Sequence, residues 1–119
     1  NPVVEVPTPS VFRQFARNGA FSEPLEPSVF PSGARDAWFA DLGACRNDLQ
    51  QPAISLCPAI GDVLAVIGDC AGVRLHRMSG SGATCIGLFD TRDAAEAARQ
   101  AVSHACHGWW CAAGVLHHQ

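Results

Sequence analysis

The chain has no hydrophobic run long enough to cross a membrane. A transmembrane helix needs about 20 consecutive apolar residues, and no apolar run of the 119 residues approaches that length. A secretion signal is not visible either, because Asn1-Pro2 is not followed by the basic and apolar segments of a signal peptide. These absences predict a cytoplasmic protein without a membrane partner.

The cysteines lack the spacing of a redox or zinc motif. Six are present, none forms a Cys-x-x-Cys pair, and most stand beside apolar residues, where a free thiol behaves as a small buried hydrophobe. Without a secretion signal we expect a reducing compartment, in which thiols stay free. A group of cysteines and histidines near the C-terminus matches no zinc template, so we expect no metal there and keep a metal-binding protein as an alternative. This group consists of Cys106, His107, Cys111, His117 and His118.

The composition lacks the excess of basic residues that a nucleic-acid-binding surface needs. The net charge of −3 and the pI of about 5.9 argue against nucleic acid or an anionic membrane as a partner. Because 48% of the residues are hydrophobic and 16% charged, the chain can form a core, and its length predicts a single domain over residues 1–119. The chain begins inside a predicted strand, so we expect it to be the second half of a longer protein.

Apolar periodicity and turn residues predict alternating strands and helices. Thr8 before Pro9, Asp36, and Asn47-Asp48 are predicted helix caps, and Asp90 or Thr91 is predicted to cap the last helix. Strands are predicted over residues 1–7, 73–78, 84–89 and 109–116. Helical segments are predicted over residues 8–18, 36–42, 47–56, 58–68 and 91–105, with a loop over residues 19–33.

This order of elements predicts an α+β fold. Two adjacent strands with a helical crossover on each side are typical of the ferredoxin-like, split βαβ arrangement, an antiparallel sheet with helices on one face. The run Thr84–Phe89 is more continuously apolar than the other strands, so we expect it in the centre of the sheet. The chain contains no internal repeat and no low-complexity tract.

The most informative stretch is the Gly-Ser loop, residues Ser79–Ala83, between two predicted strands. No Lys-Ser/Thr pair follows its glycines, so it is not a Walker A motif. It also lacks the third glycine of G-x-G-x-x-G and the frame of a nucleophile elbow. Two interpretations remain open: a loop that turns backbone N–H groups toward a ligand, and a tight connection between strands.

Residues Arg77–Thr84, continued by Gly87-Leu88-Phe89, resemble the third motif of the GHMP small-molecule kinases. Three further stretches resemble the same family in the right order, so the resemblance covers nearly the whole chain. They are Asn1-Pro2 with Thr8–Phe12, Asn47-Asp48-Leu49 with Pro58, and Gly108-Trp109-Trp110. The family's Pro-x-x-x-Gly-Leu-Gly-Ser-Ser-Ala motif, which binds ATP, is missing, as are its catalytic Asp and Lys.

The resemblance implies that this chain is the C-terminal, substrate-side lobe of such a kinase, with an N-terminal lobe in cis. That missing lobe would bind ATP and Mg, so no catalytic residue is expected here. In the branch whose substrate is a cytidine-diphosphate-linked sugar alcohol, Phe12 would stack on the cytosine, and Thr8 and Pro9 would line the base and sugar. The loop would close over the substrate near the transferring phosphoryl group, through Ser79, Gly80, Ser81, Gly82 and Ala83.

Alternatives to these roles stay open at the level of sequence. Phe12 is also consistent with a core position beside Phe15, and Arg77 with either a phosphate contact or a buried stem. For the whole chain, the alternatives are the lobe of another GHMP kinase and a free-standing ferredoxin-like module that binds a small regulatory molecule.

Overall fold

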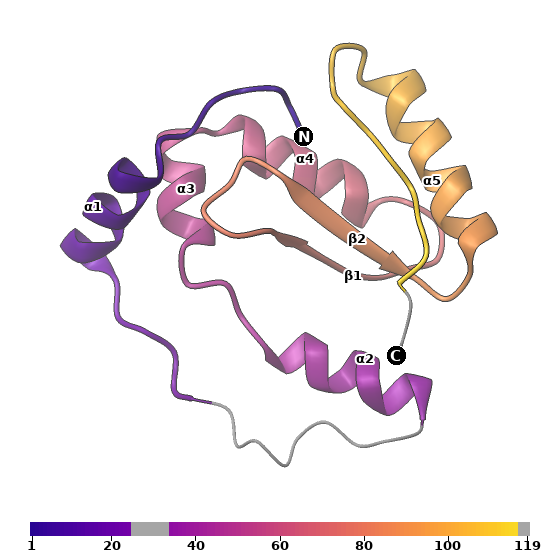
Figure 1. The fold of residues 1–119 in the computed structure, drawn as a ribbon, viewed down its shortest axis with the longest axis horizontal. Helices are drawn as coiled ribbons and strands as arrows, with labels where there is room; N and C mark the ends of the chain where they lie inside the picture. Colours follow the sequence, from indigo (N-terminus) through magenta and orange to yellow (C-terminus); the bar gives the residue numbers. More distant parts are fainter. Residues whose placement is uncertain (25–33, 117–119) are drawn as a thin grey trace.

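The computed structural model describes residues 1–24 and 34–116. Most of the loop predicted over residues 19–33 lies outside the described residues, and its first part, residues 19–24, forms neither helix nor strand. The elements follow one another as in Figure 1: α1 (Thr8–Asn18), α2 (Arg35–Ala44), α3 (Gln50–Leu56), α4 (Ala59–Gly68), β1 (Val73–Met78), β2 (Cys85–Phe89) and α5 (Arg92–Ala105). None of these helices is long and apolar enough to cross a membrane.

The sheet in the described residues is a hairpin of two antiparallel strands, β1 and β2. Met78 pairs with Cys85 and Arg77 with Ile86, and the register shifts between Val73 and Leu75. Both strands of the hairpin were predicted, and this part of the prediction is confirmed. The α+β class holds for the described residues. The four-stranded ferredoxin-like sheet is not confirmed, because the described residues form a sheet of two strands.

The two outer strands of the prediction are wrong for this structure. Residues 1–7 and 109–116 contain no strand, although a single backbone pair joins Asn1 to Trp110. The expected central position of residues 84–89 is wrong for the same reason, because β2 has β1 as its one partner in the described sheet. A strand exists only where a neighbour satisfies its backbone groups, and its own residues do not supply that neighbour.

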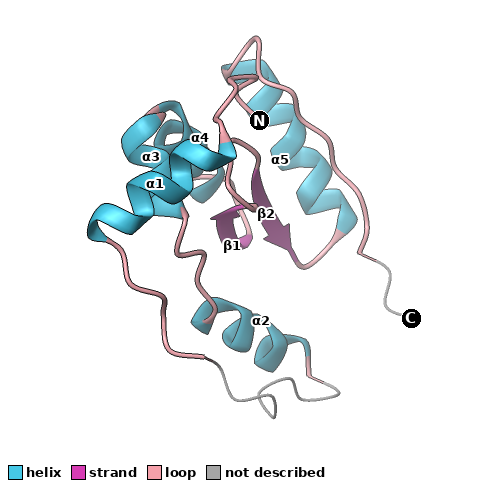
Figure 2. Cartoon of the chain, turned by 60° about the vertical axis from the view of Figure 1, so that its left-hand side comes forward, coloured by secondary structure: helices cyan, strands magenta, loops and turns pink. Residues whose placement is uncertain are grey.

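Helix α4 packs closely against the hairpin (Figure 2). A Cβ atom on Gly87 would lie 2.6 Å from Cγ2 of Ile67, and one on Gly68 would lie 3.1 Å from the ring of His76. Real Cβ contacts are rarely so short, so these two glycines permit the close approach of helix and strands. The predicted stripe of α4 is confirmed in its buried residues Ile60, Val63 and Leu64.

The main core cluster lies where α1, α3, α4 and the end of β1 meet. Val11, Ala53 and Ile60 have no exposed surface, and Met78 and Ala83 have almost none. Because Ala83 belongs to the connection between the strands, this cluster anchors the Gly-Ser loop to three helices. Truncating a fully buried side chain of this kind costs roughly 2–5 kcal/mol.

The predicted helix caps divide into one that is confirmed and several that are wrong. Thr91 Oγ1 accepts a hydrogen bond from the N–H of Ala94 at 3.1 Å, as predicted for the last helix. Thr8 is the first helical residue and not the cap, since Pro7 precedes α1 and offers no capping side chain. Asp36 lies within the first turn of α2.

Candidate functional site

The Gly-Ser loop joins β1 to β2 in a conformation that its glycines allow. The N–H of Ser79 donates to the carbonyl of Thr84 at 2.8 Å, and the N–H of Gly82 donates to the carbonyl of Ser79 at 3.2 Å. Gly80 and Gly82 have φ angles of 58° and 95°, in the left-handed region that residues with a side chain rarely adopt. The loop is therefore a defined turn.

One side of the loop is packed and the other is open. A Cβ atom on Gly82 would lie 3.1 Å from Ile60 Cδ1 and from Met78 Sδ, so this position faces the core closely. A Cβ atom on Gly80 would meet nothing within 4 Å, and Ser79 and Gly80 are exposed. The core thus fixes the side of the loop at Gly82, and the side at Ser79 and Gly80 is open to solvent.

Asn47 holds the loop through its side-chain amide. Its Nδ2 donates to the carbonyl of Met78 at 2.9 Å and to the carbonyl of Gly80 at 2.8 Å. Its Oδ1 accepts from the N–H of Leu49 at 3.0 Å, so both ends of the amide are engaged. Asn47 is not the cap of α3, which begins at Gln50 after Leu49, but its bond to Leu49 closes the turn that leads into this helix.

Gln50 is a second support that the sequence did not reveal. Its Oε1 accepts a hydrogen bond from the N–H of Met78 at 3.0 Å. Asn47 and Gln50 therefore engage the carbonyl and the N–H of the same residue, the last of β1. A glutamine at the start of a helix gives no signal of this contact, because the partner lies 28 positions away in sequence.

Asp48 does not cap α3, and its side chain connects the start of this helix to the segment after α1. Its carboxylate accepts from the N–H of Ser22 at 2.8 Å and from the Ser22 hydroxyl. These hydrogen bonds, the hydroxyl's first, lower the pKa of Asp48 below its usual value. The contact joins the segment after α1 to the start of α3.

The structure brings the two predicted substrate segments together. Thr8 Oγ1 and Ser81 Oγ are 2.8 Å apart and share a hydrogen bond, although 73 positions separate them in sequence. Both hydroxyls lie at the surface, so the start of α1 borders the open side of the loop. Pro9 is exposed beside them.

Phe12 lies outside the core. It is 48% exposed, whereas Val11 and Phe15 of the same helix are buried. Phe12 follows Thr8 by four positions, so the two side chains share one face of α1. The core alternative for Phe12 is therefore wrong, and its ring is available to a ligand on the side of α1 that borders the loop.

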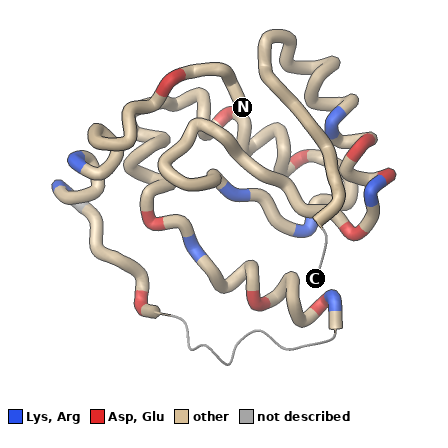
Figure 3. The backbone as a smooth tube through the Cα atoms, viewed as in Figure 1, with Lys and Arg blue, Asp and Glu red and all other residues tan. Residues whose placement is uncertain are grey.

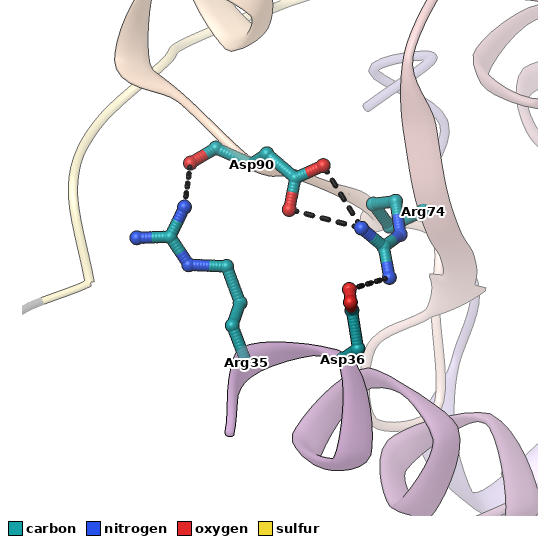
Figure 4. Close-up of polar contacts among 4 residues, drawn as sticks. All are labelled: Arg35, Asp36, Arg74 and Asp90. Carbon is teal, nitrogen blue, oxygen red and sulfur yellow. Dashed lines mark hydrogen bonds and ion pairs between the residues drawn. The ribbon is translucent and has the colours of Figure 1, made fainter. Parts of the chain in front are cut away.

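The opposite end of the hairpin is held by charges. Arg74 pairs with Asp36 of α2 at 2.8 Å and with Asp90 at 2.9 Å, and Arg35 donates to the Asp90 carbonyl at 3.0 Å (Figure 4). The guanidinium also lies 4.5 Å from the ring centre of Phe39. The hydrogen bonds from Asp36 and then Asp90 raise the pKa of Arg74. This network fastens α2 to the hairpin, far from the loop.

Charge is scarce around the loop itself. The residues from Met78 to Phe89 carry no charged side chain, and the hairpin turn is uniformly uncharged in Figure 3. Arg77 donates to the carbonyl of Leu42 at 3.1 Å, which engages the guanidinium with α2. The groups that the loop itself can offer are therefore hydroxyls and backbone groups.

The residues that the structure describes contain no group of three or more His, Cys, Asp or Glu side chains placed to hold a metal ion. Of the C-terminal cysteine and histidine group, His117 and His118 lie outside the described residues. Thiol and imidazole donors also differ from the oxygen ligands that Mg²⁺ prefers.

The family model for the C-terminal domain of GHMP kinases ("GHMP kinases C terminal") matches residues 30–108, and the chain belongs to this family. Three curated relatives carry the name 4-diphosphocytidyl-2-C-methyl-D-erythritol kinase. The chain is 46% identical to that of Rhodopseudomonas palustris strain BisB18 over 98% of its length, 47% to that of Paracoccus denitrificans over 98%, and 49% to that of Gluconacetobacter diazotrophicus over 94%. It covers 40%, 41% and 35% of these proteins. No solved structure matches the chain.

Proposed function

We propose that this chain is the C-terminal lobe of an ATP-dependent kinase that phosphorylates 4-diphosphocytidyl-2-C-methyl-D-erythritol in the non-mevalonate pathway of isoprenoid synthesis. The observation that carries the proposal is the 46–49% identity, over nearly the whole chain, to proteins of that name. Membership of the GHMP kinase C-terminal family agrees with it. The chain spans about two fifths of the length of these relatives, which leaves room for a separate nucleotide-binding lobe.

The proposed substrate side of the cleft is the surface shared by α1 and the Gly-Ser loop. Phe12 offers an exposed aromatic face for the cytosine, and Thr8 and Pro9 stand one turn earlier on the helix. Stacking of a base on an aromatic ring contributes about 1–3 kcal/mol. The hydrogen bond between Thr8 and Ser81 supports this location, because it makes one continuous surface of the two segments.

The loop Ser79–Ala83 forms the other part of the proposed site, near the group that receives the phosphate. It contributes hydroxyls and N–H groups without a charge. Phosphoryl transfer also requires a bound triphosphate, its metal ion and a residue that orients the nucleophile. We assign these, with ATP and Mg, to the N-terminal lobe in cis, so the isolated chain is expected to be inactive.

A kinetic experiment on the full-length protein tests the proposal. Phe12→Ala should raise KM for the cytidine substrate by roughly 5–150-fold, the equivalent of the lost stacking energy. Phe21→Ala is the matched control, since Phe21 is 74% exposed and is not among the proposed contacts. An unchanged KM in Phe12→Ala would exclude the stacking role.

The same assay separates the alternative functions. A full-length protein that phosphorylates homoserine or mevalonate instead would be another GHMP kinase. A protein that transfers no phosphate from ATP to any of these acceptors would support the free-standing regulatory module.

A further inference from the structure

The first turn of α1 is weakly anchored by its own contacts. Val11, one turn into the helix, has no exposed surface, whereas Thr8 and Pro9 are exposed. Pro7, the residue before the helix, offers no capping side chain. The hydroxyl pair of Thr8 and Ser81 lies at the surface, where water competes for both groups. The position of this first turn therefore depends on the chain that leads into it.

That chain is the entry segment, residues 1–8, which Figure 1 shows as the indigo coil from the N-terminus to α1. Both of its ends contact the connection between β1 and β2. At one end, Asn1 Nδ2 donates to Thr84 Oγ1 at 2.7 Å. At the other end, Thr8 shares its hydrogen bond with Ser81. The entry segment thus spans the connection that contains the Gly-Ser loop.

Asn1 is a fixed point of the entry segment. Its backbone exchanges two hydrogen bonds with that of Trp110, each 2.9 Å long. Its side-chain amide is engaged at both ends, because Oδ1 accepts from the N–H of Val3 at 2.7 Å while Nδ2 donates to Thr84. The carbonyl of Thr84 accepts from the N–H of Ser79, the bond that closes the loop. Asn1 therefore couples the path of the entry segment to the base of the loop.

The turn that Asn1 holds is sterically strained. Val3 has a φ of 57°, in the left-handed region, where a β-branched residue is a genuine outlier. Val3 and its neighbours Val4 and Glu5 are exposed, so burial of the side chain does not enforce this angle. A strained angle persists only where the surrounding structure over-determines it. The hydrogen bonds of Asn1 to Val3 and Thr84 supply that constraint.

We propose that Asn1 is a positioning residue for the substrate site. Its side chain holds the strained turn at Val3 against Thr84, and this turn sets where the start of α1 stands beside the Gly-Ser loop. In this role Asn1 acts through α1 and not by contact with the substrate. The inference rests on the proposed function, because it takes the surface between α1 and the loop as the place where the cytidine substrate binds.

A disulfide trap in the full-length protein measures this placement without ATP or substrate. Thr8→Cys and Ser81→Cys together replace the two hydroxyls by thiols, and glutathione disulfide oxidises them. Peptide mass spectrometry distinguishes the bond between positions 8 and 81 from any that the native thiols form. Adding Asn1→Ala should slow this bond's formation about 2–30-fold, and Thr84→Val, which keeps the side-chain shape, by a similar factor. Val4→Ala is the control and should not slow it, and an unchanged rate in the first two variants would overturn the proposal.

Thermal unfolding of the full-length protein tests the strain. Glycine adopts a positive φ without steric cost, so Val3→Gly should raise the unfolding temperature by about 1–3 °C. Val4→Gly is the matched control, because Val4 is also exposed but has no positive φ. There glycine should lower the unfolding temperature, since it adds only freedom to the unfolded chain. Equal losses at the two positions would show that the turn is not strained and would overturn the proposal.

Kinetics separate this inference from the proposed function. In a full-length protein that phosphorylates the cytidine substrate, Asn1→Ala and Thr84→Val should raise KM for that substrate about 2–30-fold. Both should leave kcat and KM for ATP within about twofold of wild type, which a general loss of folded protein would not do. An unchanged KM for the cytidine substrate in both variants would overturn the role of Asn1. A slower disulfide in a protein without kinase activity would instead refute the proposed function and leave the placement of α1 by Asn1 intact.

Discussion

The two ends of the β1–β2 hairpin are held by different chemistry. At the loop end, the uncharged amides of Asn47 and Gln50 engage the backbone of Met78 and Gly80, over a buried apolar cluster. At the other end, Arg74 joins two carboxylates at the surface. Hydrogen bonds between uncharged groups depend little on salt, whereas exposed ion pairs are screened. The end that we assign to the substrate is thus the one whose shape is insensitive to ionic conditions.

The largest expected effect comes from crowding the packed side of the loop. Gly82→Ala should lower the free energy of unfolding by about 2–4 kcal/mol, because a left-handed φ and a clash with Ile60 and Met78 both oppose the new methyl group. Gly80→Ala is the matched control, since it shares the left-handed φ but has open space. It should cost roughly 1 kcal/mol. Equal losses in urea denaturation would show that the contact with the core is unimportant.

The next effect comes from removing the amide that holds the loop. Asn47→Ala leaves the carbonyls of Met78 and Gly80 without their donor and should cost about 1–3 kcal/mol. Asn47→Asp keeps the acceptor for Leu49 but loses both donors, so it should lose a similar amount. If the full-length protein is the proposed kinase, both variants should also lower its kcat/KM. Wild-type stability in Asn47→Asp would contradict the role of the amide N–H groups.

At the charged end the effect should depend on salt. Arg74→Gln should lower the unfolding temperature by a few degrees at low ionic strength and by less at high salt, since the pairs with Asp36 and Asp90 are exposed. Asn47→Ala provides the comparison, because its loss should be nearly independent of salt. Calorimetry at two salt concentrations makes the measurement, and parallel shifts would remove the contrast between the two ends.

The smallest effect concerns pH. The hydroxyl and N–H of Ser22 lower the pKa of Asp48 in the folded chain. A lowered carboxyl pKa stabilises the fold above the unfolded value of about 3.9, and this contribution is lost as pH falls through the folded value. Asp48→Asn should therefore flatten the acid side of the stability profile below about pH 4. Ser22→Ala should flatten it too, and a profile unchanged in both variants would count against the hydrogen bond.

The sequence predicts those features of the fold that depend on neighbouring residues, and it misses those that depend on contacts with distant segments. The starts and ends of α1, α4 and α5 and both hairpin strands depend on local periodicity and turn residues, and these were predicted within a few residues. Asn47 and Asp48 have the residue types of helix caps, but their side chains bond to Met78, Gly80 and Ser22. Asn47 Oδ1 keeps its local partner, the N–H of Leu49, but its amide N–H groups and the Asp48 carboxylate bond to residues distant in sequence, which no local rule foresees.

The candidate site shows the same division. The resemblance to the GHMP kinases selected α1 and the loop as parts of one substrate site, on opposite parts of it, and their roles stay a prediction. That the two segments touch, through the hydrogen bond between Thr8 and Ser81, was not foreseen. The exposure of Phe12 required the fold, because Val11, Phe12 and Phe15 are equally apolar and the helix can bury only one face. The two outer strands were predicted from their own residues and are absent, because whether a strand forms depends on its partners.

The hold of Asn47 on the loop has a consequence for the polarity of the loop. The side-chain amide of Asn47 donates to two acceptors of the loop, the carbonyls of Met78 and Gly80, so these are already engaged. Within the described chain, the N–H groups of Gly80 and Ser81 have no protein partner. The open side of the loop is thus rich in donors and poor in acceptors. A ligand that presents oxygens, as a phosphoryl group or a polyol does, complements that imbalance, and a ligand that presents mainly N–H groups does not.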